Sequence, residues 1–164
     1  MGQEDSFIKD YASAFIKGIQ DVSNGKINGA LGTAKHFFGD GSTHYGANEG
    51  SATVLSFKNY LIHNIQGYLG AASEDVGSVM CSYSAINFVP NSFNSAFLTG
   101  LLRSDIRFSG FTISDYDDVI RSSEITLPRT FMNMTEERGY VLMMNAGISM
   151  MMLSGTKSVV QSEL

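Results

Sequence analysis

The sequence predicts an α/β fold in which helices alternate with short, buried, parallel strands. Apolar residues spaced for a helix alternate with apolar runs of strand length, and this order repeats four times in 164 residues. A chain of that length can bury a core as one domain. Strands that are almost entirely apolar are typical of parallel sheets that helices cover or that close into a barrel.

The predicted elements follow in four pairs of helix and strand. They are 6–22 with 30–38, 57–72 with 77–85, 94–106 with 109–115, and 135–147 with 148–153. Asp5 or Ser6 is available to cap the first helix. Thr135 is expected to cap the last helix and Gly147 to end it.

Composition excludes several classes of function. A net charge of -5 argues against a nucleic-acid-binding protein, and no apolar run has the roughly 20 residues of a membrane span. Residues 1–7 carry acids where a signal peptide needs basic and apolar residues, so no targeting segment is predicted and the compartment stays open. Cys81 is the single cysteine and is expected to be an inert core thiol.

Polar residues stand where three of the predicted strands end. They are Lys35-His36, Ser82-Tyr83-Ser84 and Ser114-Asp115. The carboxyl ends of parallel strands meet at one edge of the sheet, where chemistry is usually found in such folds. A glycine-rich loop follows the first of these strands. The sequence therefore predicts a site at this edge.

Asp115 is the most suggestive of these residues, because a carboxylate at a strand mouth can be a nucleophile, a metal ligand or a helix N-cap. Asp117 and Asp118 are interpreted as first-turn residues of the next helix. Lys35 and His36 are adjacent, so on a regular strand they would point to opposite sides.

The glycine-rich loop after the first predicted strand could also contribute to a metal site. Its ligands would be His36, Asp40, His44 and Glu49. Their spacing matches no standard zinc or calcium pattern. Neither a metal nor a cofactor is predicted.

Three blocks of sequence together resemble glycoside hydrolase family 3, the β-glucosidase and exo-β-glucanase family. They are AKHFFGDGST, the long block from VMCSYSA to RFSGF, and ISDYDDV, and the resemblance covers residues 10 to 153. It implies a partial (β/α)8 TIM-type barrel, roughly its second half, over residues 1–155. Residues 156–164 would begin a linker toward a second domain.

The resemblance also implies roles for individual residues. Asp115 matches the catalytic nucleophile, and Lys35 and His36 match the pair that holds sugar hydroxyls. Tyr83 matches a tyrosine lining the sugar pocket, and Glu49 an acidic residue of the exo-glucanase branch. Two further residues complete the set: Tyr116 stands where the family usually has tryptophan, and Asp40 matches a loop aspartate expected to organise the site.

The implied activity is hydrolysis of β-linked glucosides or oligo- and polysaccharides by a retaining mechanism. The family's general acid/base comes from a following domain, and the first half of the barrel is not represented here. The alternative is therefore an inactive, truncated carbohydrate-binding or scaffold remnant. The β-N-acetylglucosaminidase branch is disfavoured, because Gly46-Ala47-Asn48 stands where that branch has an aspartate-serine-histidine triplet.

Overall fold

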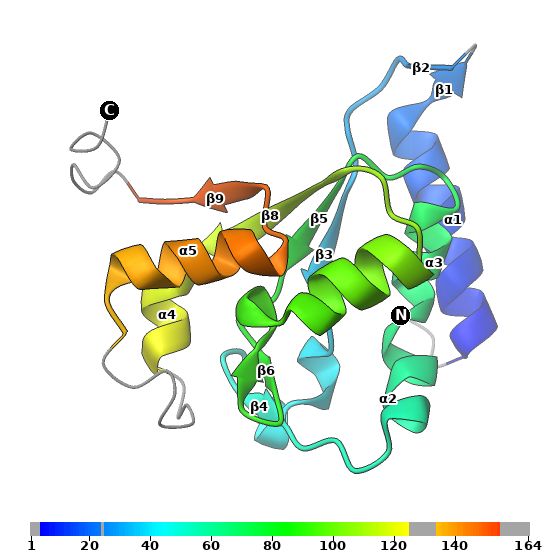
Figure 1. Ribbon diagram of the computed structural model, residues 1–164. Helices are drawn as coiled ribbons and strands as arrows, with labels where there is room; N and C mark the ends of the chain where they lie inside the picture. Colours follow the sequence, from blue (N-terminus) through cyan, green and yellow to red (C-terminus); the bar gives the residue numbers. More distant parts are fainter. Residues whose placement is uncertain (1–3, 24, 125–133, 155–164) are drawn as a thin grey trace, which may run out of the picture.

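Four parallel strands form the main sheet of the protein in a computed structural model that describes residues 4–23, 25–124 and 134–154. The strands are β3 (Thr33–Phe37), β5 (Ser78–Cys81), β8 (Phe111–Tyr116) and β9 (Met150–Met152). They lie side by side in sequence order, and every neighbouring pair is parallel (Figure 1). This is the arrangement of consecutive units of a (β/α)8 barrel, and it confirms the predicted fold class and all four strands.

Helices precede and connect these strands, as the sequence pattern predicts. They are α1 (Asp5–Gln20), α2 (Phe57–Asn64), α3 (Gln66–Ala72), a helix with π-type hydrogen bonds (Ala96–Asp105), α4 (Asp118–Glu124) and α5 (Glu136–Ala146). In α5 the Thr135 hydroxyl accepts the Arg138 N–H at 3.3 Å, and Gly147 ends the helix at a φ of 122°. Both predicted ends of this helix are confirmed.

Two details of the helices differ from the prediction. The expected single helix over 57–72 is broken at Ile65 into α2 and α3. The N-cap of α1 is Glu4, so the prediction of Asp5 or Ser6 is wrong. Asp5 instead lies in the first turn, where a carboxylate interacts favourably with the positive end of the helix dipole. Its side chain lies 3.3 Å from that of His63.

The core lies between the sheet and the helices that pack on it. Phe37 and Phe38, at the end of β3, are fully buried, and the Phe38 ring meets Phe97 edge-on at 5.0 Å. Leu98 and Leu102 present the apolar side of the π-type helix to the same cluster. The 3.6-residue spacing of apolar positions in 94–106 thus becomes one buried helix face.

Two small sheets secure the loops. Strands β1 (Val22–Ser23) and β2 (Lys26–Ile27) form an antiparallel hairpin after α1. Strands β4 (Ser51–Ala52), β6 (Ala85–Ile86) and β7 (Val89–Pro90) form the second sheet, in which β4 pairs parallel to β6. The loop after β3 is thereby joined to the loop after β5, at the carboxyl end of the main sheet.

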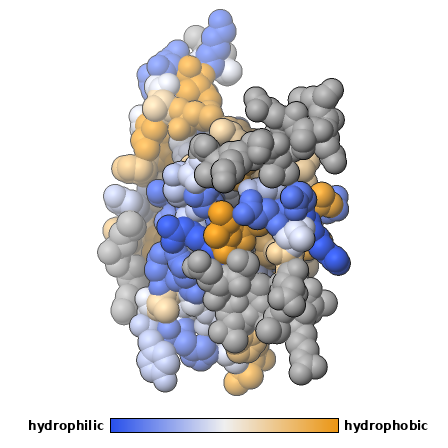
Figure 2. Space-filling view, turned by 90° about the vertical axis from the view of Figure 1, so that its left-hand side faces the viewer, coloured by the Kyte–Doolittle hydropathy of each residue, from blue (hydrophilic) through white to orange (hydrophobic). Residues whose placement is uncertain are grey.

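Both outer strands of the main sheet, β3 and β9, have one strand partner each among the described residues. Exposed apolar side chains lie near both edges. On α1, Phe7, Tyr11 and Phe15 stack along one side, and each has about half of its surface exposed. Met150 and Leu153 are exposed at the other edge. Figure 2 shows an apolar area between polar ones on the side of the molecule where β9 and α5 lie. Such edges expose unpaired backbone groups as well as apolar surface.

None of the helices within the described ranges is both long and apolar enough to cross a membrane.

Cys81 provides a probe of this core. Its side chain is 1% exposed, and burial raises the pKa of the thiol well above its usual value. We expect Ellman's reagent to label it at least about a hundredfold more slowly in native buffer than in denaturant, because labelling requires the sheet to open. Fast native labelling would contradict the buried placement expected from the sequence.

Asp117 joins the ends of β8 and β9, because its carboxylate accepts the backbone N–H and the hydroxyl of Ser154 at 2.7 and 2.5 Å. These bonds lower the pKa of Asp117. The stabilisation is therefore present above the carboxyl's unfolded pKa and is lost as the pH falls through its lower folded value. The interpretation of Asp117 as a residue of the helix's first turn is wrong, because α4 begins at Asp118.

We expect Asp117→Asn to lower the free energy of unfolding at pH 7 and to have little effect at the acid end of the curve. Asparagine tolerates the φ of 52° at this position, so backbone strain should not contribute. The measurement is denaturant unfolding as a function of pH. Asp10→Asn, at an exposed position of α1, controls for loss of a charge. An equal loss of stability at every pH would show that the ionised carboxylate is not what matters.

Candidate active site

A small cavity of about 190 Å³ opens at the carboxyl ends of β3, β5 and β8. It is lined by His36, Asp40, Asn48, Ser82, Tyr83 and Asp115. All six residues belong to the strand ends and the glycine-rich loop that the sequence indicates, and all six side chains are polar or ionisable. The cavity therefore suits a polar ligand.

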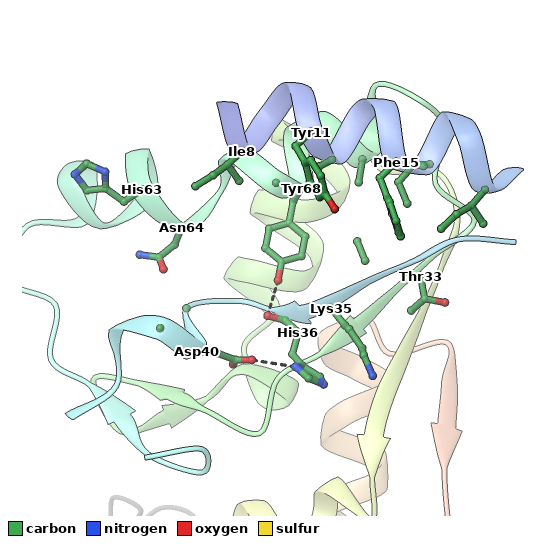
Figure 3. A pocket seen from close by; sticks show the side chains of 18 residues that line it. Ile8, Tyr11, Phe15, Thr33, Lys35, His36, Asp40, His63, Asn64 and Tyr68 are labelled. Carbon is green, nitrogen blue, oxygen red and sulfur yellow. Dashed lines mark hydrogen bonds and ion pairs between the residues drawn. The ribbon is translucent and has the colours of Figure 1, made fainter. Parts of the chain in front are cut away.

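The end of β3 supplies His36. The Lys35–His36 and Phe37–Phe38 peptide bonds are cis, and the pairing of β3 with β5 shifts between Ala34 and Phe37. The shift in pairing makes the strand irregular at this point, and Lys35 and His36 lie on the same side of it (Figure 3). The expectation that they would point apart on a regular strand does not apply here.

Lys35 and His36 nevertheless share only one of the two spaces near them. His36 lines both the small cavity and a larger groove of about 460 Å³ between α1, α3 and β3 (Figure 3). Lys35 is exposed and lines the larger groove only. Six of the groove's other lining residues come from α1 and are apolar or aromatic, among them Tyr11, Phe15 and Ile16.

Asp115 lies near the end of β8, after three buried residues, and its side chain is 14% exposed. One carboxylate oxygen accepts the N–H of Tyr116 at 2.7 Å. The other lies 3.5 Å from Nε2 of His36. Because α4 begins at Asp118 and Asp115 faces His36, the helix-cap interpretation of Asp115 is wrong.

Asp40 is held by buried hydroxyl groups. The Ser82 hydroxyl donates to Oδ1 of Asp40, and the Ser84 hydroxyl donates to the same oxygen at 3.2 Å. Both serines are 1% exposed. The second carboxylate oxygen of Asp40 lies 3.0 Å from Nδ1 of His36. The imidazole therefore stands between two carboxylates, those of Asp40 and Asp115.

Tyr83 forms a second wall. Its hydroxyl donates to the carbonyl of Tyr116 at 2.5 Å, and the Arg121 guanidinium lies 5.3 Å from its ring centroid. Burial and the nearby Asp115 raise the pKa of Tyr83, so the phenol stays protonated at ordinary pH. Arg121 also binds Glu49 at 2.6 Å. Glu49 and the exposed Tyr116 flank the small cavity without lining it.

Some contributing residues were not predicted. The loop residue Asn48 lines the cavity, and Arg121 joins Glu49 to Tyr83 from α4. Arg121 lies 72 positions from Glu49, so nothing local in the sequence indicates the contact. The sequence indicates Ser82 and Ser84 only as part of a polar strand end. Their separation by one residue indicates that both could face the same side of a strand.

The loop residues considered for a metal site have separate partners. His44 bonds to Thr53 at 2.8 Å and Glu49 pairs with Arg121, while His36 pairs with Asp40. Over residues 4–23, 25–124 and 134–154, no group of three His, Cys, Asp or Glu side chains is arranged to hold a metal ion.

Comparison with known proteins gives consistent matches. A β-xylosidase of Formosa agariphila is 29% identical over 156 residues, which are 94% of this chain and 21% of that protein. An exo-1,3/1,4-β-glucanase structure from a Pseudoalteromonas species has a TM-score of 0.72 at 25% identity, over 91% of this chain and 18% of the other. A β-glucosidase structure from Erythrobacter marinus has a TM-score of 0.80 at 21% identity, over 92% and 20%. The chain thus spans about a fifth of the length of these proteins.

The sequence profile of the Glycosyl hydrolase family 3 N terminal domain matches residues 2–164. The match takes in the three sequence blocks and the strands that carry the small cavity. The chain therefore belongs to glycoside hydrolase family 3, as a part of its N-terminal barrel domain.

Proposed function

We propose that this chain carries the nucleophile wall of a retaining β-glycosidase that releases terminal β-D-glucose, with Asp115 as the nucleophile. The observation that carries the proposal is the placement of Asp115 at the mouth of β8. There its carboxylate faces a polar cavity and lies 3.5 Å from the His36 imidazole. A retaining glycosidase needs such a carboxylate on one face of the sugar.

In the first step, a carboxylate oxygen of Asp115 attacks the anomeric carbon and forms a glycosyl ester. The bond from that carbon to the leaving oxygen breaks, and the leaving group takes the electron pair and a proton from a general acid. The Tyr116 N–H holds one oxygen of Asp115, which leaves the other directed at the cavity. In the second step, water cleaves the ester and loses its proton to the same acid/base residue.

The other lining residues would bind the sugar. His36, Asn48 and Tyr83 offer hydrogen-bonding groups on one wall of the cavity. Lys35 would reach a hydroxyl only from the groove side of β3, because it does not line the small cavity. Glu49 and Tyr116, which flank the cavity, would contact the sugar at its edge. Hydrogen bonds that strengthen as the ring flattens lower the barrier.

The described residues supply no second carboxylic acid for proton transfer in this cavity. Asp40 is the remaining carboxylate in its lining, and both of its oxygens already accept hydrogen bonds. We propose that the acid comes from outside residues 1–155, from a following domain to which residues 156–164 lead. Residues 156–164 lie outside the described part of the structure. The lack of a second acid in the described cavity lining also supports a second candidate function, in which the 164-residue chain alone binds sugar without turnover.

A substrate with a very good leaving group tests the nucleophile without needing the acid. We expect the 164-residue chain to react with 2,4-dinitrophenyl 2-deoxy-2-fluoro-β-glucoside. The reagent should release one equivalent of dinitrophenolate per protein molecule. The protein should gain the mass of one fluoroglucosyl group on the peptide that contains Asp115. Dinitrophenolate leaves without protonation, and the fluorine slows hydrolysis of the ester.

Asp115→Asn should abolish the adduct, whereas Asp10→Asn, on exposed α1, should not. The xylose-configured reagent should react more slowly if glucose is the preferred sugar. Labelling at another residue, or labelling that survives Asp115→Asn, would refute Asp115 as the nucleophile. Steady turnover of an ordinary aryl glucoside by this chain would instead refute the need for an outside acid.

A further inference from the structure

We infer that Asp40, held by Ser82 and Ser84, is a positioning residue that fixes the tautomer of His36 and so decides whether Nε2, the ring nitrogen that faces the cavity, accepts or donates a hydrogen bond. The inference deepens the proposed function and rests on it for the identity of the ligand. It draws on hydrogen bonds that join the ends of β3 and β5.

The serine contacts establish Asp40 as an acceptor. The Ser84 N–H donates to the Ser82 hydroxyl oxygen at 2.9 Å, so the hydroxyl proton of Ser82 is free to point elsewhere. It points to Oδ1 of Asp40, which also accepts from the Ser84 hydroxyl. Two donors on one oxygen, at serines that are each 1% exposed, favour an ionised carboxylate in one fixed orientation.

The fixed carboxylate then determines the state of His36. An ionised carboxylate can only accept, so Nδ1 of His36, 3.0 Å from Oδ2 of Asp40, must carry the hydrogen. In the neutral ring Nε2 is then the acceptor. This nitrogen lies 3.5 Å from Asp115 and lines the cavity. A neutral His36 thus presents an acceptor to a sugar hydroxyl, and a protonated one presents a donor.

The loop is built to keep Asp40 in this place. Gly39 makes the turn after β3 at a φ of 93°, and a Cβ there would lie 1.7 Å from the Tyr60 hydroxyl, so no side chain fits. On the opposite side of β3 from the ring, Tyr68 donates its hydroxyl to the backbone carbonyl of His36 at 2.5 Å (Figure 3). Backbone and ring of His36 are therefore held from two directions.

Nitrogen-15 NMR of the chain's three histidines tests the inference directly. At the alkaline end of a titration, long-range proton–nitrogen spectra should show His36 with its hydrogen on Nδ1. The Asp40→Ala variant should shift the ring toward the Nε2–H form. His63 offers an internal control, because it pairs with Asp5 at 3.3 Å with 71% of its side chain exposed. Asp5→Ala should leave the spectrum of His36 unchanged.

A ligand readout links the tautomer to function. In Asp40→Ala, the concentration of the dinitrophenyl fluoroglucoside that gives half-maximal labelling should rise about tenfold, the effect of losing one hydrogen bond near a charged group. An Nε2–H tautomer in the unmodified chain would overturn the inference, and this measurement needs no variant to fold. An unchanged tautomer in folded Asp40→Ala would overturn it as well. Absence of labelling in the unmodified chain would refute the proposed function instead, while the tautomer result would stand.

Discussion

The parallel pairing of β3, β5 and β8 is the constraint on which the site depends. Ser78 pairs with Thr33 on one side and with Phe111 on the other, so the three strands begin in register. Strands that start level and run parallel end at the same edge. His36, Tyr83 and Asp115 are far apart in sequence, and the register brings them around one cavity. A one-residue slip in any strand would turn its polar end toward the core.

The loops at that edge are held in a complementary way. The pairing of β4 with β6 joins the chain after β3 to the chain after β5. The bonds from Ser82 and Ser84 to Asp40 tie the same two segments together nearer the cavity. Without these contacts, ordering the glycine-rich loop after β3 would be unfavourable in free energy, because glycine loses the most backbone entropy on folding. The hydrogen bonds to Asp40 and the small sheet therefore stabilise one arrangement of the loop.

The sequence predicts the strands and their polar ends because both are local patterns. A largely apolar run such as 148–153 indicates a strand wherever its neighbours lie, and β9 is found there, although Met150 is exposed and not buried as expected. Contacts across the fold have no such pattern. The Glu49–Arg121 pair depends on how α4 follows β8, and the space that Lys35 lines depends on an irregular backbone at the end of β3. The break at Ile65 was missed because the apolar spacing continues through it.

Strand β3 has two roles that cannot be separated. Its carboxyl end supplies His36 to the small cavity, while its outer side, together with α1, forms the apolar groove that His36, Asp40 and Lys35 also line. An apolar segment seated in that groove would cover exposed Tyr11 and Phe15 and would also contact the groove side of His36 and Asp40. A segment bound there would act on α1 and on the site residues together, because both line the same groove. Strand β3 thus links the packing of α1 to the placement of His36.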